Sequence, residues 1–228
     1  CIRDRLYTAH LIKKRNPNAK IILAGNHVSS LPDAVFSDSP YVDVVVKLEG
    51  EPLYCDLVEC LQKKRPIQSF EGIVYRENNR IKETPGYGTV KDFNSLPAPA
   101  YHLLRPWAEE IPDRMGRVSG FMDISLRTSY GCPNRCAFCG VTPNWNICRY
   151  RSADRVLEDI SYAKEALRGK KVNLSYFDDE NFTCNSSHVT SISKMMQKED
   201  IRIDGVLASV PDLTASMAEN LSYFSDSV

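Results

Sequence analysis

Hydrophobic residues in the first part of the chain follow two spacings, one typical of helices and one typical of buried strands. Residues 2–15 carry apolar side chains at helical spacing. Short apolar runs at 20–24 and 41–46 have the length of parallel strands. Further helical patterns begin near Pro32 and from Glu51. Helices and strands alternate with short connections, which predicts an α/β fold with a parallel sheet.

The pattern changes over residues 71–118. Two short alternating runs joined by Asn78-Asn79 predict a β-hairpin. A stretch with little periodicity follows, and it is interrupted by the prolines at positions 85, 97, 99, 106 and 112. We therefore interpret residues 71–118 as a hairpin followed by a proline-rich linker.

Residues 119–228 repeat a strand and a helix. Strands are expected at 122–129, 171–177 and 203–209, with helices near 152–169, at 188–197 and from Thr214. Ser152 is a good N-cap for the first of these helices. Such units are typical of a βα barrel, in which the chemistry gathers at the carboxyl ends of the strands. Three units make about half of a barrel, and the chain begins inside a helix, so we expect an internal fragment of a longer protein.

Composition sets further bounds. Lysine and arginine number 29 and are balanced by 29 acidic residues, so no net charge favours nucleic acid or an anionic membrane as a partner. No apolar run approaches the roughly 20 residues that span a bilayer, and no signal peptide is recognised. The composition predicts a cytoplasmic protein in a reducing compartment.

Three cysteines are the strongest chemical signal. Cys132, Cys136 and Cys139 form a C-x3-C-x2-C motif directly after the strand expected at 122–129. Closely spaced thiolates are typical ligands of iron-sulfur clusters. A cluster that only transfers electrons normally uses four cysteines, so three ligands leave one iron open to a substrate or cofactor.

Zinc binding and inert thiols are the alternatives. A structural zinc site needs a fourth ligand, usually from a second closely spaced pair. The other cysteines form no such pair: Cys1, Cys55, Cys60, Cys148 and Cys184.

The three-cysteine motif resembles that of the radical S-adenosylmethionine (SAM) enzymes. The resemblance implies that the loop holds a 4Fe-4S cluster whose unique iron binds SAM, with the backbone of Phe138 near the adenine. It also implies that an electron from a flavodoxin or ferredoxin-type reductant cleaves SAM. The resulting 5′-deoxyadenosyl radical then abstracts hydrogen from the substrate.

Two segments at expected strand ends resemble the cobalamin (B12)-binding domain that precedes the radical SAM core in one large subfamily. Residues 24–29 resemble its GG-x-H-x-[ST] segment, and residues 47–51 resemble its GEGE segment. Ala24 and Leu48 replace glycines and leave less room for close backbone approach.

The resemblance implies cobalamin contacts from four residues: Gly25, His27, Glu49 and Gly50. The alternative for His27 is a hydrogen-bonded surface histidine, since the surrounding residues lack the D-x-H-x-x-G motif of a cobalt ligand. The alternative for Glu49 and Glu51 is a pair of solvated carboxylates at a helix N-terminus, where negative charge is favoured.

An acidic segment, Asp178 to Thr183, follows the strand expected at 171–177. Turn and capping residues are one interpretation. The segment also resembles the D-[DE]-x-[NF]-[FT] stretch that closes the second barrel strand in the same subfamily, which implies contacts to the SAM amino group from Asp178, Asp179 and Asn181. Residues 94–101 similarly resemble the D-x-LP-x-PA-[WY] connector between the two domains.

Together these features predict an α/β protein of three parts. Residues 1–70 resemble the C-terminal part of a Rossmann-like (flavodoxin-like) cobalamin-binding domain, 71–118 are hairpin and linker, and 119–228 resemble the first half of a radical SAM partial (β/α)6 TIM-type barrel. The implied function is a radical SAM enzyme, cobalamin-dependent, for methyl transfer or related radical chemistry on an unknown small-molecule or peptide substrate. We expect the fragment alone to be inactive.

Two alternatives stay open. One is a radical SAM enzyme whose N-terminal domain does not bind cobalamin. The other is a non-enzymatic iron-sulfur or zinc-binding protein.

Overall fold

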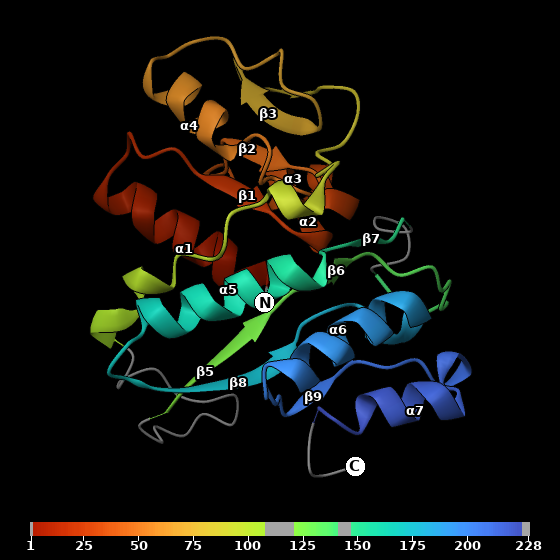
Figure 1. Ribbon diagram of the computed structural model, residues 1–228. Helices are drawn as coiled ribbons and strands as arrows, with labels where there is room; N and C mark the ends of the chain where they lie inside the picture. The colour runs from red at the N-terminus through yellow and green to blue at the C-terminus, as the bar shows by residue number, and fades with distance from the viewer. Residues whose placement is uncertain (1, 108–120, 141–146, 225–228) are drawn as a thin grey trace. The chain divides into compact units, whose positions relative to one another are not determined.

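The computed structural model describes residues 2–107, 121–140 and 147–224. Cys1 and the end of the expected linker, residues 108–118, lie outside these ranges. The chain divides into two compact units, the first comprising Cys1–Lys91 with Phe138–Asn144 and the second comprising Asp92–Ala137 with Trp145–Val228. Figure 1 labels their helices and strands.

The first unit is a four-stranded sheet with helices on both faces. Its elements are α1 (Ile2–Arg15), β1 (Ile22–Ala24), α2 (Asn26–Ser30), α3 (Pro32–Asp38), β2 (Val44–Val46), α4 (Tyr54–Gln62), β3 (Ile73–Glu77) and β4 (Arg80–Glu83). The strand order is β1-β2-β3-β4. Strands β1 and β2 are parallel, as predicted, with Ile22 opposite Val44.

The side chains of β2 alternate between two cores. Val45 packs with Val28 and Val35 from α2 and α3. Val44 and Val46 point to the other face and pack with Leu57 of α4. All three valines are buried, whereas β1 is only half-buried. Among the described residues β1 is the edge strand of the sheet, so one of its sides has no strand partner.

The hairpin expected near residues 72–83 forms, and it belongs to this sheet. Strand β3 pairs antiparallel with β2, and β4 pairs antiparallel with β3. Asn78 and Asn79 have positive φ angles of 49° and 60°, the combination that a two-residue type I′ turn requires. The hairpin thus extends a parallel pair with two antiparallel strands.

The second unit contains a parallel three-stranded sheet of order β5-β8-β9. Its elements are η1 (Phe93–Ser95), η2 (Tyr101–Leu103), η3 (Arg105–Trp107), β5 (Phe121–Leu126), β6 (Ser129–Tyr130), β7 (Arg149–Tyr150), α5 (Ala153–Ala166), β8 (Lys171–Phe177), η4 (Phe182–Cys184), α6 (Ser186–Lys198), β9 (Gly205–Val206), η5 (Val210–Asp212) and α7 (Ala215–Leu221). Figure 1 shows α5, α6 and α7 side by side along this sheet. Ile160 of α5, Ile192 of α6 and Met217 of α7 share one core with β5 and β8. The prediction of consecutive parallel βα units is confirmed.

Two predicted strands are shorter than expected. The strand expected at 122–129 ends at Leu126, and Ser129–Tyr130 instead forms β6, which pairs antiparallel with β7. The strand expected at 203–209 is only Gly205–Val206. In both cases the pairing partner, which a linear pattern does not contain, decides where the strand ends.

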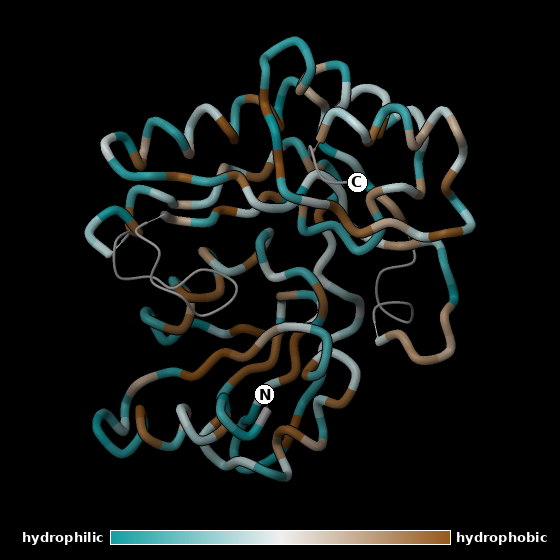
Figure 2. The backbone as a smooth tube through the Cα atoms, turned by 90° about the horizontal axis from the view of Figure 1, so that it is seen from below, coloured by the Kyte–Doolittle hydropathy of each residue, from teal (hydrophilic) through white to brown (hydrophobic). Residues whose placement is uncertain are grey.

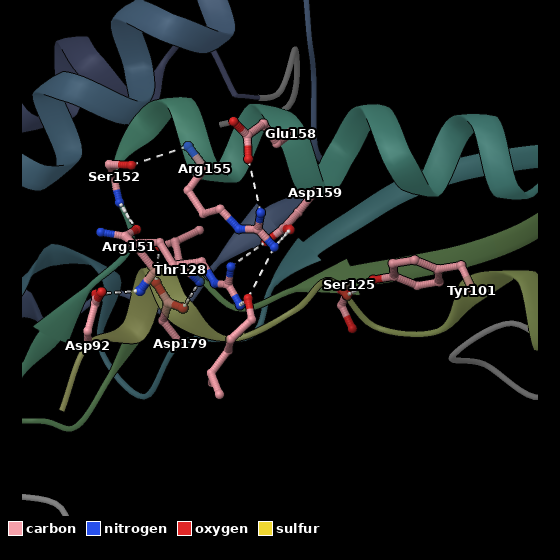
Figure 3. A network of polar contacts seen from close by, with 12 residues as sticks. Asp92, Tyr101, Ser125, Thr128, Arg151, Ser152, Arg155, Glu158, Asp159 and Asp179 are labelled. Atoms are coloured by element: carbon pink, nitrogen blue, oxygen red, sulfur yellow. Dashed lines mark hydrogen bonds and ion pairs between the residues drawn. The ribbon is translucent and has the colours of Figure 1, made fainter. Parts of the chain in front are cut away.

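The segment that joins the two sheets in sequence is held to α5 by a buried charged network (Figure 3). Asp159 forms ion pairs with Arg151 at 2.8 Å and with Arg155 at 3.1 Å. The same two arginines donate to the carbonyl oxygen of Leu96, at 3.3 and 3.1 Å. The connector-like residues 94–101 therefore pack with the barrel unit rather than lying apart from it.

No helix within the described ranges is long and apolar enough to cross a membrane. Figure 2 shows hydrophobic and hydrophilic residues alternating along the backbone.

Candidate cluster and cofactor site

Asp179 lies at the carboxyl end of β8 and holds the end of the neighbouring strand. Its side chain is buried. One carboxylate oxygen, Oδ1, accepts hydrogen bonds from the backbone N–H groups of Thr128 at 2.7 Å and Ser129 at 2.9 Å. The other, Oδ2, accepts from the hydroxyl of Thr128 at 2.5 Å (Figure 3). Burial raises the pKa of Asp179 above its ordinary value, although these hydrogen bonds oppose the shift.

Glu180 holds the following residues. Its Oε1 accepts from the Arg127 guanidinium at 2.7 Å, and its Oε2 accepts from the backbone N–H of Gly131 at 3.1 Å. Burial disfavours the charge of Arg127, but Glu180 raises its pKa above the ordinary value. Gly131 directly precedes Cys132, so Asp179 and Glu180 together fix the backbone from Thr128 to the start of the cysteine loop.

A short ladder closes the two ends of the cysteine loop. Ser129 pairs with Tyr150, and Tyr130 pairs with Arg149. Gly131 has a φ of 92°, a backbone conformation that favours glycine at the point where the loop leaves β6. The segment that carries the cysteines therefore starts and ends at the same place, beside the carboxyl ends of β5 and β8.

The predicted cluster ligands lie on this loop, close to solvent. Cys132 and Cys139 are half-buried, and Cys136 is exposed. Phe138 is 92% exposed. Across residues 2–107, 121–140 and 147–224, no group of three or more His, Cys, Asp or Glu side chains is arranged to hold a metal ion. Ligation by the three thiols, and adenine contact by the Phe138 backbone, stay predictions.

The three predicted contacts to the SAM amino group differ in their surroundings. Asp178 is exposed and lies 3.8 Å from Arg127. Asn181 is buried; it donates to Asp212 at 2.8 Å and accepts from the Thr183 hydroxyl at 2.9 Å. The carboxylate of Asp179 is buried and accepts hydrogen bonds from Thr128 and Ser129. Only Asp178 presents its carboxylate to solvent, and the three contacts stay predictions.

Arg127, Thr128 and His188 belong to this site but were not predicted from the sequence. His188 of α6 is buried, and its Nε2 lies 2.9 Å from the Thr128 hydroxyl. Burial lowers its pKa to about 4, so the imidazole is neutral at pH 7. Arg127 and Thr128 fell inside the strand expected at 122–129, so the sequence did not mark them as residues that follow a strand; His188 gave no signal beyond its place in a helix.

In the first unit, Ser29 joins the loops that follow β1 and β2. Its hydroxyl donates to the Gly25 carbonyl at 2.8 Å and accepts from the Leu48 N–H at 2.8 Å. Gly25 has a φ of 111°, and a Cβ placed there would meet only the Arg5 side chain, at 3.9 Å. His27 of α2 is half-buried. The position that a Gly25 side chain would take is thus uncrowded among the described residues.

Glu49 and Gly50 are engaged within the unit. Glu49 is buried, and its Oε2 accepts from the Val90 N–H at 2.5 Å. A Cβ at Gly50 would lie 2.2 Å from the Tyr54 ring, so the end of that side chain would have to move to admit one. Leu48, where the family pattern has glycine, adopts a left-handed φ of 64°. Cobalamin contact by the four predicted residues stays a prediction.

Comparisons with known proteins give a consistent set of relatives. No known protein-family model matches the chain. An uncharacterized methyltransferase of Pyrococcus horikoshii is 28% identical over 208 residues, which cover 90% of this chain and 43% of that protein. The cobalamin-dependent radical SAM methyltransferase TokK of Streptomyces tokunonensis is 28% identical over 138 residues, 60% of this chain and 20% of TokK.

A solved structure extends the comparison to the fold. The radical SAM methyltransferase TsrM from Kitasatospora setae, solved with cobalamin and a [4Fe-4S] cluster bound, superposes with a TM-score of 0.66 and 15% identity, covering 97% of this chain and 43% of TsrM. The chain spans less than half the length of each of these proteins. These similarities confirm the resemblance that the sequence motifs indicated, and they relate the chain to the cobalamin-binding-domain radical SAM proteins.

Proposed function

We propose that the chain is part of a radical SAM enzyme in which Cys132, Cys136 and Cys139 hold a 4Fe-4S cluster that binds SAM. The observation that carries this proposal is the support of the cysteine loop: Asp179 and Glu180, at the end of β8, fix the backbone that enters it. A loop with ordered ends suits a cluster whose ligands come from one short segment. Three thiols and no fourth ligand in the motif fit a cluster with an open iron.

The bound cluster would supply the electron that cleaves the sulfonium bond of SAM. The residues of this chain would bind and orient. Asp178, the exposed carboxylate at the end of β8, is suited to accept hydrogen bonds from an ammonium group. Arg127, held by Glu180, keeps a positive charge beside the loop entry.

We further propose that the strand-end loops of the first unit bind cobalamin, for methyl transfer or related radical chemistry. The open backbone at Gly25, with His27 in the next turn, supports this reading. The substrate is a small molecule or peptide of unknown identity, and the electron donor is a flavodoxin or ferredoxin-type protein.

A second candidate is a radical SAM enzyme whose first unit does not bind cobalamin. Three observations favour it. Leu48 places a large side chain on a left-handed backbone, and the buried Glu49 accepts a hydrogen bond from Val90. The Tyr54 ring takes up the space beside Gly50. Each of these features reduces the space or the polar groups that the loop after β2 presents to a ligand.

Anaerobic reconstitution separates these candidates. Incubation with iron, sulfide and hydroxocobalamin, followed by metal and corrinoid analysis, should give about four iron atoms per chain, as one cubane cluster requires. Bound corrinoid supports the first reading, and iron without corrinoid supports the second. Stoichiometric zinc in the purified protein with no uptake of iron would contradict both.

A further inference from the structure

Two cysteines outside the cluster motif lie side by side in the second unit. The Sγ atoms of Cys148 and Cys184 are 3.9 Å apart, and both side chains are half-buried. They are 36 residues apart in sequence. Cys148 directly precedes β7, and Cys184 ends η4, so the fold brings together the exit of the cysteine loop and the turn after β8.

The surroundings hold Cys184 and the backbone next to Cys148. The hydroxyl of Tyr150 lies 3.4 Å from the Cys184 Sγ, and Tyr150 is itself fixed by its strand pairing with Ser129. On the other side, Asn181 accepts from Thr183 and caps η4, which ends at Cys184. The pair is therefore held by two elements of the same unit rather than by a chance approach of exposed side chains.

We infer that Cys148 and Cys184 are a covalent modification site. A small-molecule disulfide such as oxidised glutathione oxidises the two thiols, and an intramolecular disulfide between Cys148 and Cys184 results. A disulfide requires the two sulfurs at about 2.05 Å. Starting from a separation of 3.9 Å, the two sulfurs have to approach each other by about 1.9 Å.

The reaction balances as two thiol-disulfide exchanges. One protein thiolate attacks the oxidant, forming a mixed disulfide and releasing one glutathione thiolate. The second protein sulfur then attacks the mixed disulfide, forming the bond between Cys148 and Cys184 and releasing the second glutathione. The two protons lost by the protein thiols end on the two glutathione molecules, and the oxidant takes up two electrons.

Cys184 is better placed to attack the mixed disulfide in the second step than to attack the oxidant in the first. Burial raises its pKa to about 11, so it is mainly a neutral thiol at pH 7 and reacts poorly with an oxidant in solution. A neighbouring mixed disulfide on Cys148 offsets this disadvantage: Cys184 must still lose its proton to attack, but the two sulfurs are then held at close range. We therefore expect the intramolecular bond and not two separate glutathione adducts.

The experiment is a non-reducing peptide map of the purified 228-residue chain after treatment with oxidised glutathione under anaerobic conditions. Trypsin should leave residues 136–149 joined to residues 172–194, with a mass two hydrogen atoms below the sum of the free peptides. Peptide 136–149 also contains Cys136 and Cys139, so fragmentation of the cross-linked wild-type species must place the bond on Cys148. Thiol counts before and after treatment should fall by two.

Variants give an independent assignment. Cys148→Ser and Cys184→Ser should each lose the cross-linked species, while Cys55→Ser, at an exposed cysteine of α4, should keep it. A cross-link that persists in Cys148→Ser, a bond placed on Cys136 or Cys139, or wild-type peptides that carry only separate glutathione would overturn the inference. Neither the map nor the variants depend on iron uptake, so the outcome stands apart from the proposed cluster.

Discussion

Asp179 and His188 share the hydroxyl of Thr128, which lies 2.5 Å from the Asp179 carboxylate and 2.9 Å from the His188 imidazole. This chain of contacts joins the end of β8 to α6 through Thr128, the second residue after β5. All three side chains are buried. The backbone that leads into the cysteine loop is thus fixed by groups that sequence places 50 to 60 positions away.

Replacing Asp179 by alanine should destabilise the second unit by about 3 kcal/mol. The substitution leaves the buried N–H groups of Thr128 and Ser129 without their acceptor, at roughly 1–3 kcal/mol each. The expected loss exceeds that of a typical surface substitution, which is usually within about 0.5 kcal/mol. Urea denaturation followed by circular dichroism measures it.

Asp178→Ala is the matched control, because this neighbouring carboxylate is exposed and its contact with Arg127 is long, at 3.8 Å. Its free energy of unfolding should stay close to that of the wild type. Equal losses in the two variants would show that the buried hydrogen bonds of Asp179 do not stabilise the fold.

Stability should fall in mild acid because of His188. Its pKa is about 4 in the folded protein, against 6.5 as the ordinary value. Between these values the unfolded chain binds more protons than the folded one, so stability is fully present above pH 6.5 and is lost as the pH falls towards 4. The full effect is about 3 kcal/mol at 1.4 kcal/mol per pKa unit.

His188→Gln removes the titrating group and keeps an amide that can reach the Thr128 hydroxyl. The difference in unfolding free energy between the wild type and this variant should change with pH only between about 4 and 6.5, the two pKa values of the histidine. A difference that is constant across this range would contradict the burial of a neutral imidazole.

Iron binding should depend on the motif cysteines alone. Alanine at Cys132, Cys136 or Cys139 should abolish cluster uptake, since three ligands from one loop cannot be reduced to two without losing the site. Cys148→Ala and Cys184→Ala should retain it. Iron and sulfide analysis after anaerobic reconstitution gives the comparison, and loss of the cluster in the Cys148 variant would show that the ligand set is assigned incorrectly.

Gly88→Ala should destabilise the first unit. A Cβ at this position would lie 2.0 Å from the Glu49 carbonyl oxygen, so the backbone has to move, at a cost of about 1–3 kcal/mol for overpacking. Gly140→Ala is the control, because a Cβ there meets no atom of the described residues within 4 Å. The midpoint of thermal unfolding should drop for the first variant only; unchanged midpoints in both would show that the contact yields easily.

The sequence determined the order of the elements. Local patterns were sufficient for Ser152, which caps α5 by accepting from Arg155 as predicted, and for the turn at Asn78-Asn79. Both depend on interactions within a few residues, which a linear reading contains. The motif at Cys132, Cys136 and Cys139 is equally local. For that reason the family resemblance could be recognised from the sequence alone.

Tertiary structure alone decided what the polar residues near that motif do. Asp178, Asp179 and Asn181 look alike in sequence, yet one faces solvent, one holds the end of β5 and one binds Asp212. Leu126 ends a strand and Ser129 starts another because their partners are β8 and β7. Burial and hydrogen bonds between residues 30 to 60 positions apart set these roles. The spacing of residues along the chain does not tell which side chain will be the hydrogen-bond partner of a distant buried donor or acceptor.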